Sequence, residues 1–378
     1  MGWTFPLCPK PPNWSLDWDR LLASFDWLGG LADTPQDPSF HPEGDVLIHT
    51  WMVVEALVDD PRWRALDDES RSILFAAALL HDAGKPVTTQ VIDGRLSSPG
   101  HARKGAQIAQ AILYQQWPDS RDPVPFHARQ RIVGLVRHHG LPVWYWERAD
   151  ADRQIIAASL RMSLDRLSLL AEMDLRGRTA EDVGDLLARV DLFREESQSL
   201  GCFADAYPFP SDHTRFLYFR SDTRSPTIEA FDDTRCEVVL MSGLPGAGKD
   251  TWIAANLPDW PILSLDELRK QLEVSPADGQ GAVVMQAKER AREYLRRTES
   301  FVWNATNVTR QTRASLIDLF AAYHARVRIV YVEAPWTDLL RRNRRRMSPI
   351  PEQALYSLAE RLDVPALTEA QMVEWQAQ

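Results

Sequence analysis

The sequence predicts a two-domain chain, in which an all-α domain precedes an α/β domain with a parallel sheet. Residues 45–200 carry apolar side chains at helical spacing, whereas short β-branched runs alternate with helical segments from Glu237 onward. The length of 378 residues also exceeds that of one ordinary domain. We therefore expect domains at residues 1–200 and 237–378, with a linker or domain edge at residues 201–236.

In the first half, the apolar spacing predicts a series of helices. Their expected ranges are 18–28, 46–58, 70–82, 101–116, 128–139, 152–176 and 181–200. Gly84 is a candidate C-cap for the third helix, and Pro86 a stop signal. A Gly-containing turn or a small hairpin is expected at residues 92–96.

In the second half, strands and helices alternate. Strands are expected at 237–241, 261–264, 300–303 and 326–332, and helices at 251–256, 266–272, 280–298, 310–323, 336–346 and 352–362. Such alternation predicts a parallel sheet covered on both faces. Ligands should then bind at the carboxyl ends of its strands.

Composition restricts the compartment and the partners. The net charge of −10 argues against a chain-wide basic surface, so a polyanion would need a local patch. Three cysteines without a Cys-x-x-Cys pair support neither a disulfide framework nor a zinc ribbon. The N-terminus has no signal pattern and no run of 18 apolar residues occurs. We expect a cytoplasmic protein with no membrane partner.

A glycine-rich stretch at residues 242–251 joins the first strand of the second half to a helix. Its glycines let main-chain N–H groups approach a phosphate; they are Gly243, Gly246 and Gly248. Lys249 would reach the β- and γ-phosphates, and the helix N-terminus adds partial positive charge. The spacing fits the Walker A pattern, except that Asp250 stands where a Ser or Thr metal ligand is usual and Thr251 comes one residue late.

Histidine and aspartate recur at intervals in the helical half. The pair His81-Asp82 follows an apolar helix and precedes Gly84, so both side chains can converge at a helix end. Imidazole and carboxylate suit a divalent transition metal, Mg²⁺ or Mn²⁺. For any single histidine a satisfied or solvent-facing role is the more common one, and we keep that interpretation for His41 and His127.

The ordered set resembles the HD phosphohydrolase superfamily over about residues 40–180, chiefly in the phrase Leu-Leu-His-Asp-Ala-Gly-Lys-Pro at residues 79–86. Residues 171–178 are similar to the end of the HD module in bacterial tRNA nucleotidyltransferases. The resemblance implies core metal ligands at His49, His81, Asp82 and Asp174, with Asp165 competing for the last place. It also implies a second metal on His101 and one of His138 and His139, and Mn²⁺, Ni²⁺, Co²⁺, Zn²⁺ or Cu²⁺ as the ion. Lys85, three residues after Asp82, is placed to clamp a substrate phosphate.

Further polar residues follow the later strands. Asp266 comes just after the second strand, where it would accept a hydroxyl proton, and Arg269 lies one turn on, placed to hold an acceptor phosphate. Five arginines occur within residues 341–346, and Arg342 and Arg346 share a helix face as candidate lid residues over a triphosphate. The plainer interpretations are a helix-capping carboxylate for Asp266 and a solvated basic face or nucleic-acid patch for the arginines.

This second set resembles the 5′-hydroxyl polynucleotide kinases over about residues 237–365. The resemblance implies Lys249 as a phosphate ligand, Asp266 as general base, ATP or GTP as donor, and Mg²⁺ or Mn²⁺ as its metal. Together the two halves resemble the bacterial HD-Pnk family of RNA end-healing enzymes. That likeness implies a bifunctional enzyme that phosphorylates 5′-hydroxyl ends and removes a 2′,3′-cyclic phosphate or a 2′(3′)-phosphate. Nucleic acid ends, with RNA expected, would be its partners, and an RNA ligase on another chain would act next.

Two other functions are compatible with the same motifs. One is a small-molecule kinase joined to an HD nucleotidase that acts on nucleosides or nucleotides. The other is a nucleotide sensor in which the glycine-rich loop regulates an HD domain without turnover. The intact His/Asp set and Asp266 argue against the sensor, because a sensor needs neither a general base nor a metal-activated water.

Overall fold

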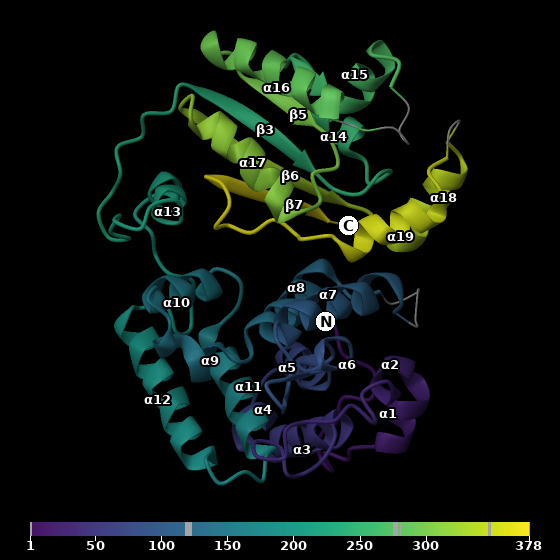
Figure 1. Ribbon diagram of the computed structural model, residues 1–378, viewed down its shortest axis with the longest axis vertical. Helices are drawn as coiled ribbons and strands as arrows, with labels where there is room; N and C mark the ends of the chain where they lie inside the picture. Colours follow the sequence, from purple (N-terminus) through teal and green to yellow (C-terminus); the bar gives the residue numbers. More distant parts are fainter. Residues whose placement is uncertain (1, 118–122, 275–278, 280, 347–348, 378) are drawn as a thin grey trace. The chain divides into compact units, whose positions relative to one another are not determined.

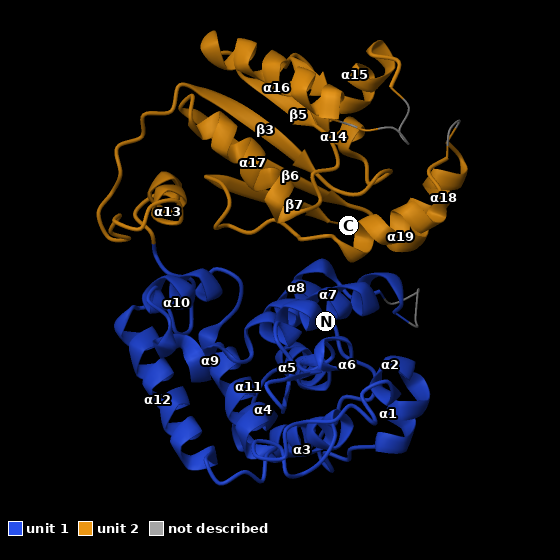
Figure 2. Ribbon diagram, viewed as in Figure 1, with its two compact units in different colours: residues 1–208 blue, residues 209–378 orange. Residues whose placement is uncertain are grey.

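The computed structural model describes residues 2–117, 123–274, 279, 281–346 and 349–377. The chain divides into two compact units, Met1–Pro208 and Phe209–Gln378, which are coloured separately in Figure 2. Each unit has its own hydrophobic core.

The first unit is helical, as predicted (Figure 1). Its helices are α1 (Trp18–Ser24), α2 (Asp26–Gly29), α3 (Val46–Asp59), α4 (Pro61–Arg64), α5 (Asp68–Leu80), α6 (Lys85–Thr88), α7 (His101–Gln115), α8 (Phe126–His138), α9 (Leu141–Trp144), η1 (Tyr145–Glu147), α10 (Ala151–Ser159), α11 (Leu164–Arg176) and α12 (Val183–Ser199). Helix α5 is buried from Arg71 to Leu80 and packs against α3, α8 and α11. Asp45 and Asp67 cap α3 and α5 by accepting main-chain hydrogen bonds from Ile48 and Ser70.

Two predicted helices are each divided in the structure. The helix expected at 18–28 breaks at Phe25, whose extended backbone lets its ring enter the core. The helix expected at 152–176 breaks between α10 and α11, where Ser163 is extended and the main-chain N–H of Asp165 donates to the carbonyl of Phe203. The apolar periodicity continues across both breaks, because each flanking helix buries a face in the same core.

The possible hairpin at residues 92–96 is present. Strands β1 (Gln90–Ile92) and β2 (Arg95–Ser97) pair antiparallel, and their turn residues Asp93 and Gly94 both have positive φ. The segment before residue 40 belongs to the first core, because Phe5 packs against the rings of Phe25, Phe75 and Trp117.

In the described part of the second unit, the strands form one parallel sheet in the order β4-β5-β3-β6-β7. They are β3 (Cys236–Ser242), β4 (Ile262–Ser264), β5 (Phe301–Asn304), β6 (Ala325–Glu333) and β7 (Met372–Ala377). The parallel sheet is the one predicted, with β7 added at its edge. Strand β7 was not predicted, because only Val373 of its six residues is buried and the segment shows no run of apolar side chains.

Helices flank this sheet (Figure 1). They are α13 (Asp212–Tyr218), α14 (Lys249–Asn256), α15 (Leu265–Gln271), α16 (Gly281–Arg296), α17 (Arg310–Ala321), α18 (Trp336–Arg344) and α19 (Glu352–Glu360). Helix α16 packs on β4 and α17 on β6. Gln280, where the fourth of these was expected to begin, lies outside the described residues.

Residues 209–236, part of the expected linker, lie within the second unit. Phe216 of α13 is buried in the second core, and the Arg215 guanidinium donates to the carbonyls of Leu367 and Gln371. Among the described residues, no helix has both the length and the apolar character needed to cross a membrane.

Candidate functional site

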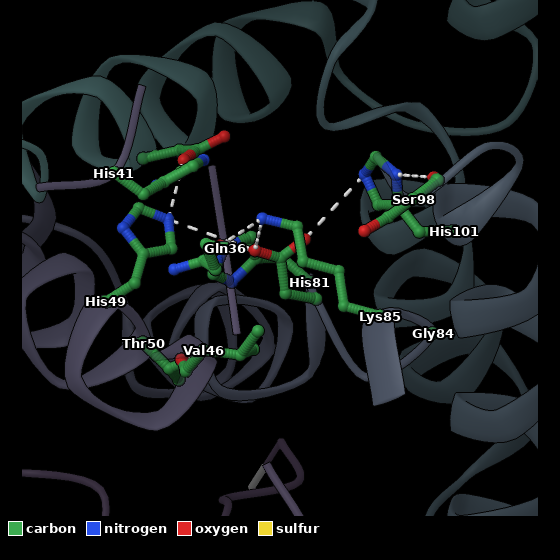
Figure 3. Close-up of polar contacts among 12 residues, drawn as sticks. Gln36, His41, Val46, His49, Thr50, His81, Gly84, Lys85, Ser98 and His101 are labelled. Atoms are coloured by element: carbon green, nitrogen blue, oxygen red, sulfur yellow. Dashed lines mark hydrogen bonds and ion pairs between the residues drawn. The ribbon is translucent and has the colours of Figure 1, made fainter. Parts of the chain in front are cut away.

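Six polar side chains from different helices meet in the first unit, and we call them the His/Asp cluster. Its members are His49, His81, Asp82, His101, His139 and Asp174. Most lie at helix ends: His81 and Asp82 follow α5, His101 begins α7, His139 follows α8, and Asp174 is near the end of α11. Figure 3 shows the His49, His81 and His101 rings with the contacts around them.

Gly84 is not the C-cap that was predicted for the third helix, because α5 ends at Leu80 with His81 as its cap and Gly84 precedes α6 with a negative φ. Its role is to let α7 approach Asp82. A Cβ at Gly84 would lie 2.1 Å from the main-chain oxygen of His101. Only glycine therefore fits where the start of α7 crosses the turn after Asp82. This contact brings His101 Nε2 to 3.7 Å from Asp82 Oδ1.

Asp82 lies between two groups of ligand atoms. On one side its Oδ2 is 3.2 Å from His81 Nε2 and 3.9 Å from His49 Nε2. On the other side its Oδ1 faces His101 Nε2 and, at 4.0 Å, His139 Nε2. His49 Nε2 is also 3.0 Å from Asp174 Oδ1. Each group has three donors close enough to share one ion, and Asp82 belongs to both.

In three of the four cluster histidines, hydrogen bonds to the main chain determine which ring nitrogen carries the hydrogen. The Nδ1 atoms of His81, His101 and His139 lie 2.7–2.8 Å from the carbonyls of Ala78, Ser98 and Val136. A carbonyl can only accept, so each Nδ1 carries the hydrogen and each Nε2 is left to bind a metal. His81 Nε2 and Asp82 Oδ1 are buried and make no hydrogen bond. The donor set therefore fits a divalent transition metal.

Charge within the cluster is balanced by neighbouring cations. Burial would raise the pKa of Asp82, but the nearby ammonium of Lys85 outweighs it and holds that pKa well below the usual range. Arg178 and His49 do the same for Asp174. Burial lowers the pKa of His139 to about 4, so this ring is neutral at physiological pH.

Lys85 is the nearest cation to the cluster. Its Nζ lies 2.7 Å from Asp82 Oδ2 and donates to Gln36 Oε1 at 2.6 Å. Its side chain is largely buried, and it also lines a cavity of about 630 Å³ that opens over the His/Asp cluster, which we call the cluster cavity. A volume of this size is typical of small-ligand sites.

Some expected residues lie outside the cluster. His138 lines the cluster cavity but is in neither ligand group; burial, with nearby arginines, lowers its pKa to about 3. Asp165 is half-exposed in the first turn of α11, where Arg166 pairs with it. His127, which was expected to be a satisfied or solvent-facing histidine, is half-exposed and pairs with Glu69.

Residues that were not predicted from the sequence support the cluster. Glu43 Oε1 lies 2.9 Å from His41 Nδ1 and 3.0 Å from His49 Nδ1, and these three residues form a further group of possible metal ligands. His41 and Glu43 lie shortly before α3 and follow no helical period, and their nearness to His49 in the sequence is the one signal that points to them.

A second site lies at the carboxyl edge of the sheet in the second unit. The loop after β3 turns at Gly243, Gly246 and Gly248, all with positive φ, as the glycine-rich pattern predicted. A Cβ at Gly243 would lie 2.3 Å from the Val332 carbonyl oxygen. Lys249 Nζ folds over the loop and donates to the carbonyls of Gly243 and Leu244 at 2.9 and 3.0 Å.

Two further elements end at the same edge. Asn304, the last residue of β5, donates to Asp250 Oδ1 at 2.7 Å and so ties this strand to the first turn of α14. Thr251, also in that turn, is exposed. Asp266 lies in the first turn of α15, is largely exposed, and pairs with Arg269. Burial lowers the pKa of Lys249 to about 8, against the opposing charges of Asp250 and Asp266.

The arginine-rich helix α18 reaches the glycine-rich loop. Arg342 Nη1 donates to the carbonyl of Gly246 at 3.0 Å. Arg346 is exposed, and its charge also lowers the pKa of Lys249. Asn343 between them is buried and exchanges hydrogen bonds with the main chain of Ile350, which anchors the end of the helix.

Family models match both units. Residues 46–173 match the model of an HD domain, and residues 238–365 match that of an AAA domain. A multifunctional CCA protein of Ralstonia nicotianae is 32% identical over 186 residues, which is 46% of this chain and 38% of that protein. Another from Halorhodospira halophila is 39% identical over 120 residues, or 32% of this chain and 24% of that protein. The chain thus spans well under half the length of these relatives.

A solved structure of a candidate kinase from Chloroflexus aurantiacus J-10-fl is 17% identical, with a TM-score of 0.32. The match covers 38% of this chain and 86% of that one. Each unit of the chain thus matches a different family model, an HD domain in the first unit and an AAA domain in the second.

Proposed function

We propose that this chain is a bifunctional RNA end-healing enzyme. Its P-loop unit phosphorylates a 5′-hydroxyl end, and its HD unit removes a 2′,3′-cyclic phosphate or a 2′(3′)-phosphate. The observation that carries the proposal is the presence, in one chain, of a His/Asp cluster built around Asp82 and a P-loop with a carboxylate at the same sheet edge.

In the HD unit the chain supplies a preorganised ligand shell. The cluster residues would hold a divalent transition metal, chosen among Mn²⁺, Ni²⁺, Co²⁺, Zn²⁺ and Cu²⁺. When bound, such a metal lowers the pKa of water and neutralises phosphate charge. Lys85 holds its ammonium at the wall of the cluster cavity, where it would meet a phosphate oxygen.

In the kinase unit the reaction transfers the γ-phosphoryl group of ATP or GTP to the ribose 5′-oxygen. Lys249 would exchange its hydrogen bonds to the loop carbonyls for bonds to the triphosphate, because a phosphate oxygen carries more negative charge than a carbonyl oxygen. Asp250 would hold Mg²⁺ or Mn²⁺, which neutralises the triphosphate when bound. Asp266 would accept the hydroxyl proton, and Arg269 would turn from it to the phosphate that follows the first nucleoside.

The two steps have complementary products. Phosphoryl transfer leaves a 5′-phosphate, and hydrolysis leaves a 3′-hydroxyl once the cyclic ester has opened and the phosphate has been removed. Those are the ends that a ligase on another chain joins.

The test follows both ends of one short RNA that carries a 5′-hydroxyl and a 2′,3′-cyclic phosphate. The protein is incubated with ATP, Mg²⁺ and Mn²⁺, and each end is analysed separately. The proposal expects phosphate gain at the 5′ end and phosphate loss at the other. Activity on free nucleosides alone would favour a small-molecule kinase, and nucleotide binding without turnover would favour a sensor.

A further inference from the structure

Trp144 is an exposed aromatic residue in the wall of the cluster cavity. Its side chain is 45% exposed, although a buried position is usual for so large an apolar surface. Neither the His/Asp cluster nor the chemistry proposed above requires an indole there. An exposed indole in the wall of this cavity provides a flat apolar face for a planar ligand.

A short segment with buried side chains joins the ring to the His/Asp cluster. His139 is followed by Gly140 and then by α9, whose Leu141, Pro142 and Val143 are buried. A Cβ at Gly140 would lie 3.6 Å from Trp144 Cδ1, so the indole rests against the main chain directly after a cluster ligand.

Arg189 from α12 fixes the orientation of the indole. Its guanidinium carbon lies 5.0 Å from the ring centroid of Trp144 and 4.7 Å from that of Trp146. Trp146 Nε1 donates to the carbonyl of Val143, which holds the second ring. A ring that is already ordered loses little conformational entropy when a ligand stacks on it.

Cationic side chains lie around the same cavity. Besides Lys85 and Arg178 at the cluster, its lining includes Arg103, Arg137 and Arg148, together with the cluster residues Asp82 and Asp174 and with Asp37 and Asp182. Cationic side chains combined with an aromatic platform are the combination that binds single-stranded nucleic acid: the cations meet phosphates, and the ring stacks on a base.

We propose that Trp144 forms a base-stacking subsite for the terminal nucleotide of an RNA strand whose phosphate reaches the His/Asp cluster. This rests on the proposed function, since it assumes that the HD unit acts on an RNA end. Because every base has a π face, the subsite accepts all four bases. It therefore selects a nucleotide end over a phosphoester that has no base.

The test compares two RNAs that end in the same 3′-phosphate, one with a normal terminal nucleotide and one whose terminal ribose is abasic. Binding by fluorescence anisotropy and phosphate release are measured for the full-length wild-type protein and for Trp144→Ala, Trp144→Phe and Trp146→Ala. Trp146→Ala is the matched control, because Trp146 shares Arg189 with Trp144 but is not part of the cavity lining.

For the normal end, Trp144→Ala should weaken binding and raise KM by roughly 5- to 150-fold, the range that corresponds to loss of one base stack. The abasic end should bind the wild type and Trp144→Ala alike, and Trp144→Phe should restore most of the affinity. An equal effect of Trp144→Ala on both RNAs, or no effect on either, overturns the subsite.

Failure of the proposed function gives a different pattern. If the wild type releases no phosphate but Trp144 still favours the normal end in binding, the subsite stands and the assigned reaction is wrong. If the wild type releases phosphate equally well from both ends, the reaction stands and the subsite is overturned.

Discussion

The Nε2 atoms of His101 and His139 lie 3.3 Å apart, although both rings already donate their Nδ1 hydrogens to main-chain carbonyls. Two lone pairs at this distance repel unless a cation or a proton lies between them. Burial lowers the pKa of His139 to about 4, which disfavours the proton at neutral pH. Asp82 Oδ1 faces the same space, so these three atoms are placed where they could share one cation.

The first prediction separates the two adjacent histidines after α8. His139→Ala should lower the amount of bound metal and the rate of phosphohydrolysis. Loss of an outer-shell partner typically costs roughly 10- to 100-fold, and loss of a ligand should cost at least as much. His138→Ala should keep both, because His138 is in neither ligand group. Metal analysis by mass spectrometry and phosphate release check this. Equal loss of metal and activity in the two variants would contradict the assignment of His139, and not His138, to the cluster.

The second prediction concerns metal-dependent stability. Saturating Mn²⁺, at about 100 times its Kd, should stabilise the HD unit by about 2.7 kcal/mol, because the ion binds the folded cluster. Thermal unfolding with Mn²⁺ and with a chelator measures the shift. Asp82→Asn should remove the shift, since Asp82 belongs to both ligand groups. The control Asp165→Asn lies away from the cluster and should preserve it.

The third prediction tests the general base of the kinase. Asp266→Asn should reduce 5′-phosphorylation by about 10²- to 10⁴-fold, the usual contribution of a positioned base. Glu267→Gln is the matched control, because Glu267 is the neighbouring exposed carboxylate of α15. Its contact with the capping residue Ser264 uses the main-chain N–H, which the variant keeps. Both variants should retain phosphohydrolysis. Full kinase activity in Asp266→Asn would exclude the assignment.

The fourth prediction concerns Lys249 and pH. Burial holds its pKa at about 8 in the free protein, and a bound triphosphate favours the charged form and so raises that pKa. Above about pH 8 nucleotide binding must therefore take up a proton, and affinity should fall by up to about tenfold per pH unit. Calorimetry at about pH 8.5 in two buffers of different ionisation enthalpy measures this uptake. Lys249→Arg stays charged and should abolish it; buffer-independent heats in the wild type would contradict the prediction.

The fifth prediction distinguishes two adjacent arginines of α18. Arg342 contacts the glycine-rich loop, whereas Arg341 is largely exposed and pairs with Asp338. Arg342→Ala should weaken ATP binding by about tenfold, the effect of losing one charge-assisted hydrogen bond of about 1.5 kcal/mol. Arg341→Ala should bind ATP like the wild type. Equal affinities in the two variants would show that the loop contact does not position Arg342 for the nucleotide.

The sequence determined the elements and the glycine-rich loop, because these depend on local spacing. Helical periodicity located α3, α5, α7 and α8, and the β-branched runs located β3 and β6. The glycines at these positions permit the positive φ values that the loop adopts, so their spacing indicated a tight turn.

Only the tertiary structure decided which side chains meet. His138 and His139 are adjacent in sequence, but the helix end turns only His139 toward Asp82, because neighbouring helical residues point about 100° apart. Glu43 precedes α3 and His49 lies within it, and the path of the chain between them brings Glu43 Oε1 to 3.0 Å from His49 Nδ1. The breaks inside two predicted helices, and the exposure of Trp144 beside His139, likewise depend on packing between distant segments, which no local pattern records.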